Sequence, residues 1–335
     1  APPSYDVVTA FDLYSLLIKP LEPHLPHTKH LIFVPDELLL AVPFAALLRS
    51  NEGAAFQRLA EIARARRNPT PPEQQLYAQL PWLIQSYAIT VLPSASSLKI
   101  LRETRTPASG VRERFIGFGD PILGGTGTNR GGKMVMAGRG MRVARDEIQN
   151  LDRLPSTRIE LLTVASVLGV EPASHVFLGE QATETRVLEL NQSGRLGRAA
   201  VLSFATHGLM AGQLQGLTQP ALVLTPPDTP SDEDDGLLSL EEILRLQLPN
   251  TEWVVLSACN TAAGDGSGDG LSGLARAFFF AGARTLLVSQ WSVDDVATQV
   301  LMTEIFQRYG AAHSVPPAEA LQQGMLALLQ LSATS

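Results

Sequence analysis

Short apolar runs recur along the chain and alternate with segments of helical length. The runs are uniformly apolar, with no alternation of polar residues, which is typical of strands buried on both faces of a parallel sheet. We therefore expect an α/β fold with a mainly parallel central sheet covered by helices on both faces. The expected strands are 31–34, 88–92, 115–119, 175–178, 200–205, 253–257 and 285–289.

The segments between these runs have the periodicity and capping residues of helices. The pattern is most regular after about residue 110, and two glycine-rich loops, 124–140 and 264–270, interrupt it. An acidic loop with prolines covers 226–235. The expected helices are 11–25, 54–67, 94–104, 156–168, 183–192, 239–246, 271–281, 295–308 and 317–330.

Length and charge narrow the function classes. A chain of 335 residues suits two domains, or one large α/β unit with an added part. The net charge is −7 and no basic stripe follows any expected helix, so nucleic acid is not expected as a direct partner. No apolar run is long enough to cross a membrane, and residues 1–6 do not resemble a signal peptide. The chain does not begin with Met, which is compatible with a piece cut from a longer protein or with a processed chain.

The chain has a single cysteine, Cys259, and therefore no internal disulfide. That cysteine usage fits a reducing compartment, and we expect a cytoplasmic protein. Taken alone, one cysteine is more often a small buried apolar residue than a nucleophile, and one histidine is more often structural than catalytic.

Two expected strands end in residues that can do chemistry together. Run 200–205 leads to His207 and Gly208, and run 253–257 leads to Cys259. If the two strands are neighbours, both side chains emerge at the same edge of the sheet. The histidine precedes the cysteine by about 50 residues, which is the order described for caspases. This placement favours a catalytic dyad over two structural residues.

The chemistry of thiol catalysis explains why these residue types are needed. A free thiol has a pKa near 8.5, so an imidazole must take its proton or stabilise the thiolate at neutral pH. The same imidazole then protonates the leaving amine. The oxyanion that forms needs aimed donors, for which the backbone amides of Gly208 and Cys259 are the candidates.

Six short blocks are spread in order over nearly the whole chain: 34–36 (VPD), 92–95 (LPSA), 204–208 (FATHG), 256–261 (LSACNT), 270–278 (GLSGLARAF) and 288–295 (VSQWSVDD). Together they resemble the signatures of the CHAT family. The resemblance implies a protease domain related to caspases, separases and gingipains, often joined to helical repeats such as TPRs. It implies a caspase-like three-layer sandwich in 109–335, preceded by a degenerate half in 1–108.

Carried over by motif, His207 is the general base and acid and Cys259 is the nucleophile of a cysteine endopeptidase. The cysteine block departs from the caspase sequence Gln-Ala-Cys, because Ser257 stands where the glutamine would be. The caspase preference for aspartate at the cleavage site is therefore not expected here. The partners implied are a protein or peptide substrate and a regulatory partner or upstream TPR-type repeats.

Substrate-binding residues are expected at the ends of two further strands. Asp120 ends the run 115–119 and could receive a basic P1 side chain through a charge-assisted hydrogen bond. The alternative is a turn role, since Asp before Pro is common in turns. Ser289, Gln290 and Trp291 resemble the segment that pairs with substrate in caspases. Asp294 could serve the same pocket or the first turn of the next helix.

Other function classes have weaker support. Residues 127–133 match part of a phosphate-binding loop, but Met134 replaces the magnesium-binding Ser or Thr. Asp265 and Asp269 superficially resemble part of a calcium loop, yet Arg276 stands where its bidentate Glu belongs. We therefore expect no cofactor and no metal. A catalytically silent caspase-like interaction module, and a thiol hydrolase acting on a small acyl substrate, remain as alternatives.

Overall fold

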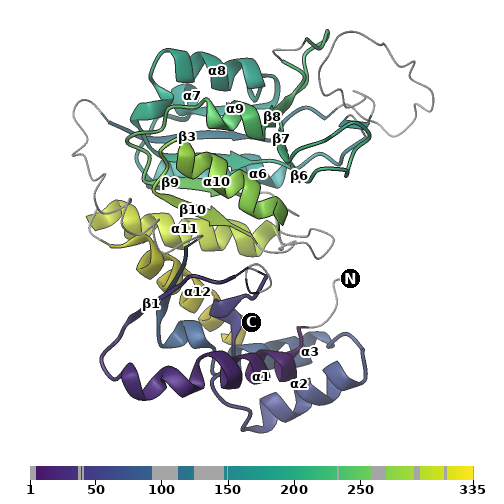
Figure 1. Cartoon of the computed structure of the whole chain (residues 1–335), viewed down its shortest axis with the longest axis vertical. Helices are drawn as coiled ribbons and strands as arrows, with labels where there is room; N and C mark the ends of the chain where they lie inside the picture. The colour runs from purple at the N-terminus through teal and green to yellow at the C-terminus, as the bar shows by residue number, and fades with distance from the viewer. Residues whose placement is uncertain are drawn as a thin grey trace. The chain divides into compact units, whose positions relative to one another are not determined.

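The computed structural model describes residues 5–36, 39, 41–92, 112–123, 147–148, 150–231, 234–257, 269–289, 295–312 and 315–334 (Figure 1). The chain forms two compact units. One contains residues 1–35, 42–92 and 304–335, and the other contains residues 36–41 and 93–303. The expected helix 94–104, the loop 124–140 and residues 264–268 of the expected loop 264–270 lie outside the described residues, whereas residues 269 and 270 of that loop are helical.

The larger unit is built on a five-stranded, all-parallel sheet (Figure 1). This confirms the expected α/β class with a parallel central sheet, as in a caspase-like sandwich. The strands stand in the order β10-β9-β5-β3-β4, so chain order and spatial order differ at the centre. Their bounds are β3 (Glu113–Gly119), β4 (Val176–Leu178), β5 (Ala199–Ala205), β9 (Trp253–Leu256) and β10 (Thr285–Val288).

Successive side chains of each strand point to opposite faces of the sheet. Because these strands are mainly apolar, both faces are apolar, and helices cover both. The face that carries Phe118, Phe204 and Leu256 packs into one core with α8 (Glu184–Gln192), α9 (Leu240–Leu244) and α10 (Asp269–Phe280). The other face receives α6 (Ser156–Val167). Its Leu161 lies so close that a Cβ on Gly119 would meet the Leu161 side chain at 2.6 Å.

A row of phenylalanines joins strands and helices in the first of these cores. Phe118 stacks on Phe177 and on Phe204, with ring centroids 5.2 and 5.3 Å apart. Phe204 also contacts Phe278 of α10 at 5.9 Å. Aromatic pairs at these distances stabilise a core beyond their buried area, so the row fixes the neighbouring strands firmly.

A small antiparallel sheet follows β5 and was not expected from the sequence. Its strands are too short for a periodicity signal, at two or three residues each. Val223 donates its backbone N–H to the carbonyl of His207 at 2.8 Å. The buried Thr206 hydroxyl donates to the Val223 carbonyl. The sheet therefore holds the backbone just beyond β5. Its strands are β6 (Gly208–Leu209), β7 (Ala221–Val223) and β8 (Leu237–Ser239).

The smaller unit pairs two parallel strands, β1 (His30–Phe33) and β2 (Ala88–Val91). Its core holds α1 (Val7–Leu17) and α2 (Ala54–Arg64). The expectation of a single helix over 11–25 is wrong. Asp6 caps α1 through the amides of Val8 and Thr9, and a 3-10 turn (Lys19–His24) with prolines at 20 and 23 replaces its second half.

The last helix of the chain belongs to the smaller unit. α12 (Pro317–Thr334) packs Met325 and Leu329 against the core of that unit. Gln322 donates its side-chain amide to the Ile84 carbonyl at 2.8 Å. The smaller unit therefore does not have the same bounds as residues 1–108. That residues 1–108 are a degenerate caspase-like half stays a prediction.

The remaining described elements are one long helix and several short helices and turns. The long helix α11 (Asp295–Ala312) contains the division between the units at residue 303. The shorter elements are α3 (Pro71–Gln74), α7 (Pro172–His175) and the 3-10 turns Phe44–Ala46, Gln75–Gln79, Leu83–Gln85, Gly179–Gln181 and Leu196–Arg198.

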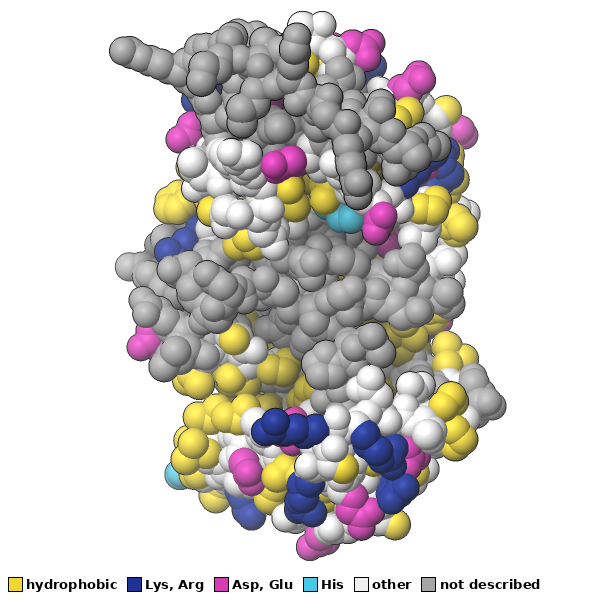
Figure 2. Space-filling view, turned by 90° about the vertical axis from the view of Figure 1, so that its right-hand side faces the viewer, with side chains coloured by type: hydrophobic (Ala, Val, Ile, Leu, Met, Phe, Trp, Pro, Cys, Tyr) yellow, Lys and Arg dark blue, Asp and Glu magenta, His cyan; other side chains and the backbone are white. Residues whose placement is uncertain are grey.

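Basic side chains of the smaller unit are interleaved with acidic ones. Figure 2 shows Lys and Arg side chains next to Asp and Glu on the lower part of one face, with no large area of a single sign. Ion pairs in this unit join Arg58 and Arg67 to Glu73, and Arg49 to Glu22. In the described part of the chain, no helix is both long enough and apolar enough to cross a bilayer.

Candidate active site

The carboxyl ends of four neighbouring strands meet at one edge of the five-stranded sheet, which we call the carboxyl edge. β5 lies between β3 and β9, with Gly119 opposite Ala205 and Phe204 opposite Leu256. The strands that lead to the histidine and the cysteine are therefore direct neighbours. The described residues that follow these strands at this edge are Asp120, His207, Ser257 and Ser289.

The imidazole of His207 is fixed by a backbone oxygen. Its Nε2 lies 2.6 Å from the carbonyl oxygen of Asp152, in the segment that leads into α6. A carbonyl only accepts hydrogen bonds, so Nε2 carries a hydrogen. In the neutral ring the lone pair is then on Nδ1, which leaves this nitrogen able to accept a proton.

The amide of Gly208 points away from the small sheet. His207 and Val223 form a hydrogen-bonded pair, and Gly208 opposite Leu222 is the next pair along. In an antiparallel ladder such pairs alternate, so the Gly208 N–H does not face β7. Among the described strands, β6 is the end strand of its sheet, and the Gly208 N–H faces its outer side. This orientation suits a donor for an oxyanion.

The end of β9 is anchored on both sides. Ser257 donates its backbone N–H to the Phe204 carbonyl at 3.0 Å and its hydroxyl to Oε2 of Glu160 at 2.9 Å. Glu160 is buried on α6. Cys259 follows two residues later and lies outside the described residues. Of the expected substrate-binding residues, Ser289 follows β10 directly, while Gln290, Trp291 and Asp294 lie outside the described residues.

Asp120 is enclosed by two arginines, and we call Asp120, Arg153 and Arg158 the Asp120 cluster. The carboxylate is 1% exposed. Arg153 donates Nε to Oδ1 at 2.9 Å and Nη2 to Oδ2 at 3.1 Å. Arg158 donates Nε to Oδ2 at 2.9 Å. The hydrogen bond to Asp120 is the main reason why the pKa of Arg153 is raised.

This arrangement does not support the expectation that Asp120 receives a basic P1 side chain. Both carboxylate oxygens already accept from arginines of the same chain, so a substrate lysine or arginine would have to displace one of them. Sequence reasoning missed both partners, because Arg153 and Arg158 lie more than 30 residues from Asp120. It also missed the Asp152 carbonyl, because a backbone atom has no signature in the sequence.

A second group of carboxyls lies at the start of α8, and we call Glu184, Asp234, Asp235 and Glu242 the Glu184 cluster. Glu184 is 1% exposed, and among the residues that the structure describes its Oε1 has no hydrogen-bond partner. Burial, followed by the nearby Glu242, raises the pKa of Glu184 to about 10. Burial also raises the pKa of Asp235 to about 6. Glu184 therefore holds a proton at neutral pH.

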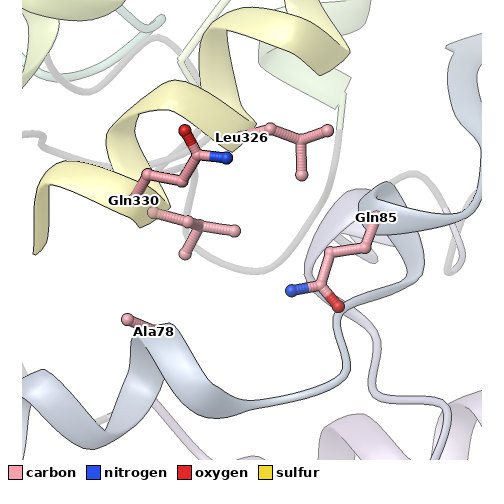
Figure 3. Close-up of a pocket in the computed structure, with 5 residues that line it drawn as sticks. Ala78, Gln85, Leu326 and Gln330 are labelled. Carbon is pink, nitrogen blue, oxygen red and sulfur yellow. The ribbon is translucent and has the colours of Figure 1, made fainter. Parts of the chain in front are cut away.

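Two other features bear on a possible site: groups of metal-ligating residue types, and a hollow in the smaller unit. Within the described residues, no group of three or more His, Cys, Asp or Glu side chains is arranged to hold a metal ion. A hollow of about 200 Å³ lies in the smaller unit, where Figure 3 shows Leu326 and Gln330 of α12 on one side and Gln85 and Ala78 on the other. It is lined by apolar and amide side chains and carries no nucleophile.

The sequence model of the CHAT domain matches residues 8–335. The chain belongs to the CHAT domain family. This family is related to caspase-like peptidases, in agreement with the parallel sheet and the residues at its carboxyl edge.

Curated relatives of this CHAT domain are much longer proteins. Human tetratricopeptide repeat protein 28 is 25% identical over 325 residues, which cover 87% of this chain and 11% of the relative. The mouse protein of the same name is 29% identical over 179 residues, covering 44% of this chain and 7% of the relative. The CHAT domain described here thus spans about a tenth of the length of the relatives it matches.

Proposed function

We propose that this CHAT domain is a cysteine endopeptidase that cleaves a protein substrate with a dyad of His207 and Cys259. The observation that carries the proposal is the hydrogen bond from His207 Nε2 to the Asp152 carbonyl, because it leaves Nδ1 free to act as a base. This imidazole stands after the strand that directly neighbours the strand leading to Cys259.

Chain geometry supports a meeting of the two residues. Phe204 and Leu256 are opposite each other, and His207 and Cys259 each follow three residues later. Neighbouring strands lie about 4.8 Å apart, and three residues extend the chain by at most about 11 Å. Equal offsets from a paired position favour side chains that leave the sheet at the same edge.

In the proposed reaction His207 Nδ1 takes the thiol proton, and the thiolate attacks the scissile carbonyl carbon. The oxyanion is stabilised by the amides of Gly208 and Cys259. The imidazolium then protonates the leaving amine as the C–N bond breaks. Water, deprotonated by His207, hydrolyses the thioester and releases a carboxylate product and the free thiol.

An extended peptide is the substrate form that the sheet favours. β10 stands at one end of the strand order, and Ser289, Gln290, Trp291 and Asp294 follow it. A peptide that pairs with this segment would gain main-chain hydrogen bonds, and pockets would supply selectivity. A preference for a basic P1 residue is not part of the proposal, because the Asp120 carboxylate is occupied.

We also propose that the peptidase activity is regulated by a partner or by repeats of the same protein. The curated relatives are named for tetratricopeptide repeats and are about ten times longer than the matched region. The same observation favours a second candidate, a catalytically silent interaction module. The cytoplasm is the compartment we propose, on the ground of the single free cysteine.

Labelling by peptidyl acyloxymethyl ketones, read by intact mass, tests the proposal. Because Cys259 is the sole cysteine, a thiol adduct reports on it alone. We expect labelling of the wild type, none of Cys259→Ala, and a loss of at least about 100-fold in rate for His207→Ala. His175→Ala is the matched control. Equal labelling of the wild type and His207→Ala would refute the dyad, and probes with Arg, Leu or Asp at P1 measure the preference.

A further inference from the structure

The segment that leads into α6 touches the candidate site through two consecutive residues. The carbonyl oxygen of Asp152 accepts the hydrogen bond from His207 Nε2. The side chain of the next residue, Arg153, forms the two-point contact with the carboxylate of Asp120. The position of the atom that orients His207 is therefore tied covalently to the position of Arg153.

Asp120 itself is held from several directions. Its backbone N–H donates to Thr157 Oγ1 at 2.9 Å. Its carbonyl accepts from the Gly179 N–H at 3.1 Å. The backbone φ is +45°, in the left-handed region, which a non-glycine residue adopts only when its surroundings determine it. The carboxylate is therefore a fixed point at the end of β3.

The segment around Asp152 is held at its flanks, where Leu151 packs against a hydrophobic cluster and the Leu154 carbonyl accepts the Thr157 hydroxyl at 2.7 Å, and between these flanks it is held by Arg153. Residues 152–154 belong to no helix or strand, and the Asp152 side chain is exposed. A planar guanidinium that binds a carboxylate at two points defines direction as well as distance. The Arg153–Asp120 contact thus fixes the peptide next to Arg153, whose oxygen faces His207.

We propose that Asp120 and Arg153 are positioning residues that hold the Asp152 carbonyl in place, and thereby set the tautomer and the ring orientation of His207. Neither residue touches substrate in this role. The catalytic consequence rests on the proposed function, but the effect on the tautomer of His207 does not.

Arg158 provides an internal comparison. It binds the same Asp120 oxygen and is similarly exposed, with 44% of its side chain accessible against 53% for Arg153. It lies on α6 and is not adjacent to Asp152 in the chain. If the cluster acted on His207 only through charge, loss of either arginine would have the same effect. If it acts through the Asp152 carbonyl, loss of Arg153 has the larger effect.

The experiment compares the full chain with Arg153→Ala, Arg153→Lys, Arg158→Ala and Asp120→Asn. The control is Arg198→Ala, an arginine 45% exposed that lies 3.9 Å from the carboxylate of Glu113. Asparagine is chosen at 120 because it tolerates a left-handed backbone. One readout is the tautomer of His207 from long-range ¹H–¹⁵N spectra of ¹⁵N-histidine protein at pH 8. The other is the rate of Cys259 alkylation by iodoacetamide from pH 5 to 9.

We expect the wild type and Arg198→Ala to show the Nε2–H tautomer alone, and Arg153→Ala and Asp120→Asn to show a mixture. The alkylation rate at pH 6.5 should fall about tenfold in these two variants, because a less firmly oriented imidazole is a poorer partner for the reactive thiolate. Arg158→Ala should lose less than about threefold, and Arg153→Lys should lie between. Equal effects of Arg153→Ala and Arg158→Ala, or an unchanged tautomer in Arg153→Ala, would overturn the proposal.

The two readouts separate this proposal from the proposed function. If Cys259 of the wild type reacts no faster than a free thiol while Arg153→Ala still changes the tautomer, the dyad fails and the positioning role stands. If Cys259 is activated and the tautomer does not depend on Arg153, the positioning role fails and the dyad stands.

Discussion

Two buried carboxyls of the larger unit have the same exposure and opposite surroundings. Asp120 and Glu184 are each 1% exposed. Asp120 accepts hydrogen bonds from two arginines, whereas Glu184 accepts one backbone N–H, from Asp235, and the charges that raise its pKa are those of other acids. A buried charge is costly unless it is paired, so the two arginines compensate the burial of Asp120, whereas burial among acids raises the pKa of Glu184 and favours its protonated form.

The difference shows how each region is suited to its place. A charged carboxylate with strong directional partners holds a geometry, which is useful beside His207. A protonated carboxyl can share its hydrogen with a neighbour, and Glu242 is the neighbouring acid that contributes most to the raised pKa of Glu184. Glu242 also caps α9, accepting the Ser239 hydroxyl at 2.6 Å. The Glu184 cluster therefore links α8 and α9 under conditions that depend on pH.

The largest effect in this comparison is expected from removal of Asp120, the carboxyl that is paired with arginines. Asp120→Ala should destabilise the protein by about 2–4 kcal/mol, a value below that of fully buried ion pairs because the arginines are half exposed. Alanine also fits poorly at φ +45°. Urea unfolding measures the change, with Asp120→Asn as the milder variant. A loss under about 1 kcal/mol would mean that the cluster does not hold this region.

Replacement of Glu184, the protonated carboxyl, should raise the stability of the protein instead of lowering it. The pKa of Glu184 is raised in the folded state. The stability that its protonated form contributes to the folded protein is therefore fully present below about pH 4.3 and is lost as pH rises toward 10. Glu184→Gln removes that loss and should stabilise the protein by about 1–3 kcal/mol at pH 8, since one pKa unit corresponds to about 1.4 kcal/mol.

The measurement for Glu184→Gln is the melting temperature between pH 5 and 9. The wild-type value should fall across this range more steeply than that of the variant. Glu241→Gln, an exposed neighbour of Glu242, is the control and should change stability by less than about 0.5 kcal/mol. Parallel curves for wild type and Glu184→Gln would show that Glu184 is ionised at neutral pH.

A third buried carboxyl stands between these two cases and should give the smallest effect. Glu160 accepts the hydroxyl of Ser257 at 2.9 Å, a neutral donor. Ser257→Ala should cost about 1 kcal/mol, the usual net value of one hydrogen bond. Thermal unfolding at neutral pH measures it, with Ser193→Ala on the far end of α8 as a control. A cost above about 3 kcal/mol would show that the Ser257–Glu160 contact contributes as much to stability as the arginine contacts of Asp120.

Much of the fold could be predicted from the sequence because it depends on side-chain patterns. Uniformly apolar runs indicated a parallel sheet, and both β5 and β9 lie close to the ranges expected. The antiparallel strands β6 to β8 could not be predicted, because two or three residues give no period. The helix over 11–25 was wrong because apolar spacing was given more weight than Pro20 and Pro23.

The site was predictable only in part, for a different reason. His207 and its strand were recognised because a reactive residue after a buried strand is visible in one dimension. The partners of Asp120 and the oxygen that binds His207 come from a segment about 30 residues after Asp120 and 55 before His207. Such contacts follow from the packing of α6 on the sheet, which no local pattern encodes. The role of Cys259 stays a prediction.

The hydrogen bond between His207 and a peptide oxygen has a consequence for genetic studies. Every residue type supplies the same carbonyl, so position 152 can drift through evolution without loss of this contact. An alanine scan would score Asp152 as neutral, although it contributes the atom that orients the imidazole. Only chemical synthesis of the backbone, with an altered linkage at this position, would reveal the contribution directly.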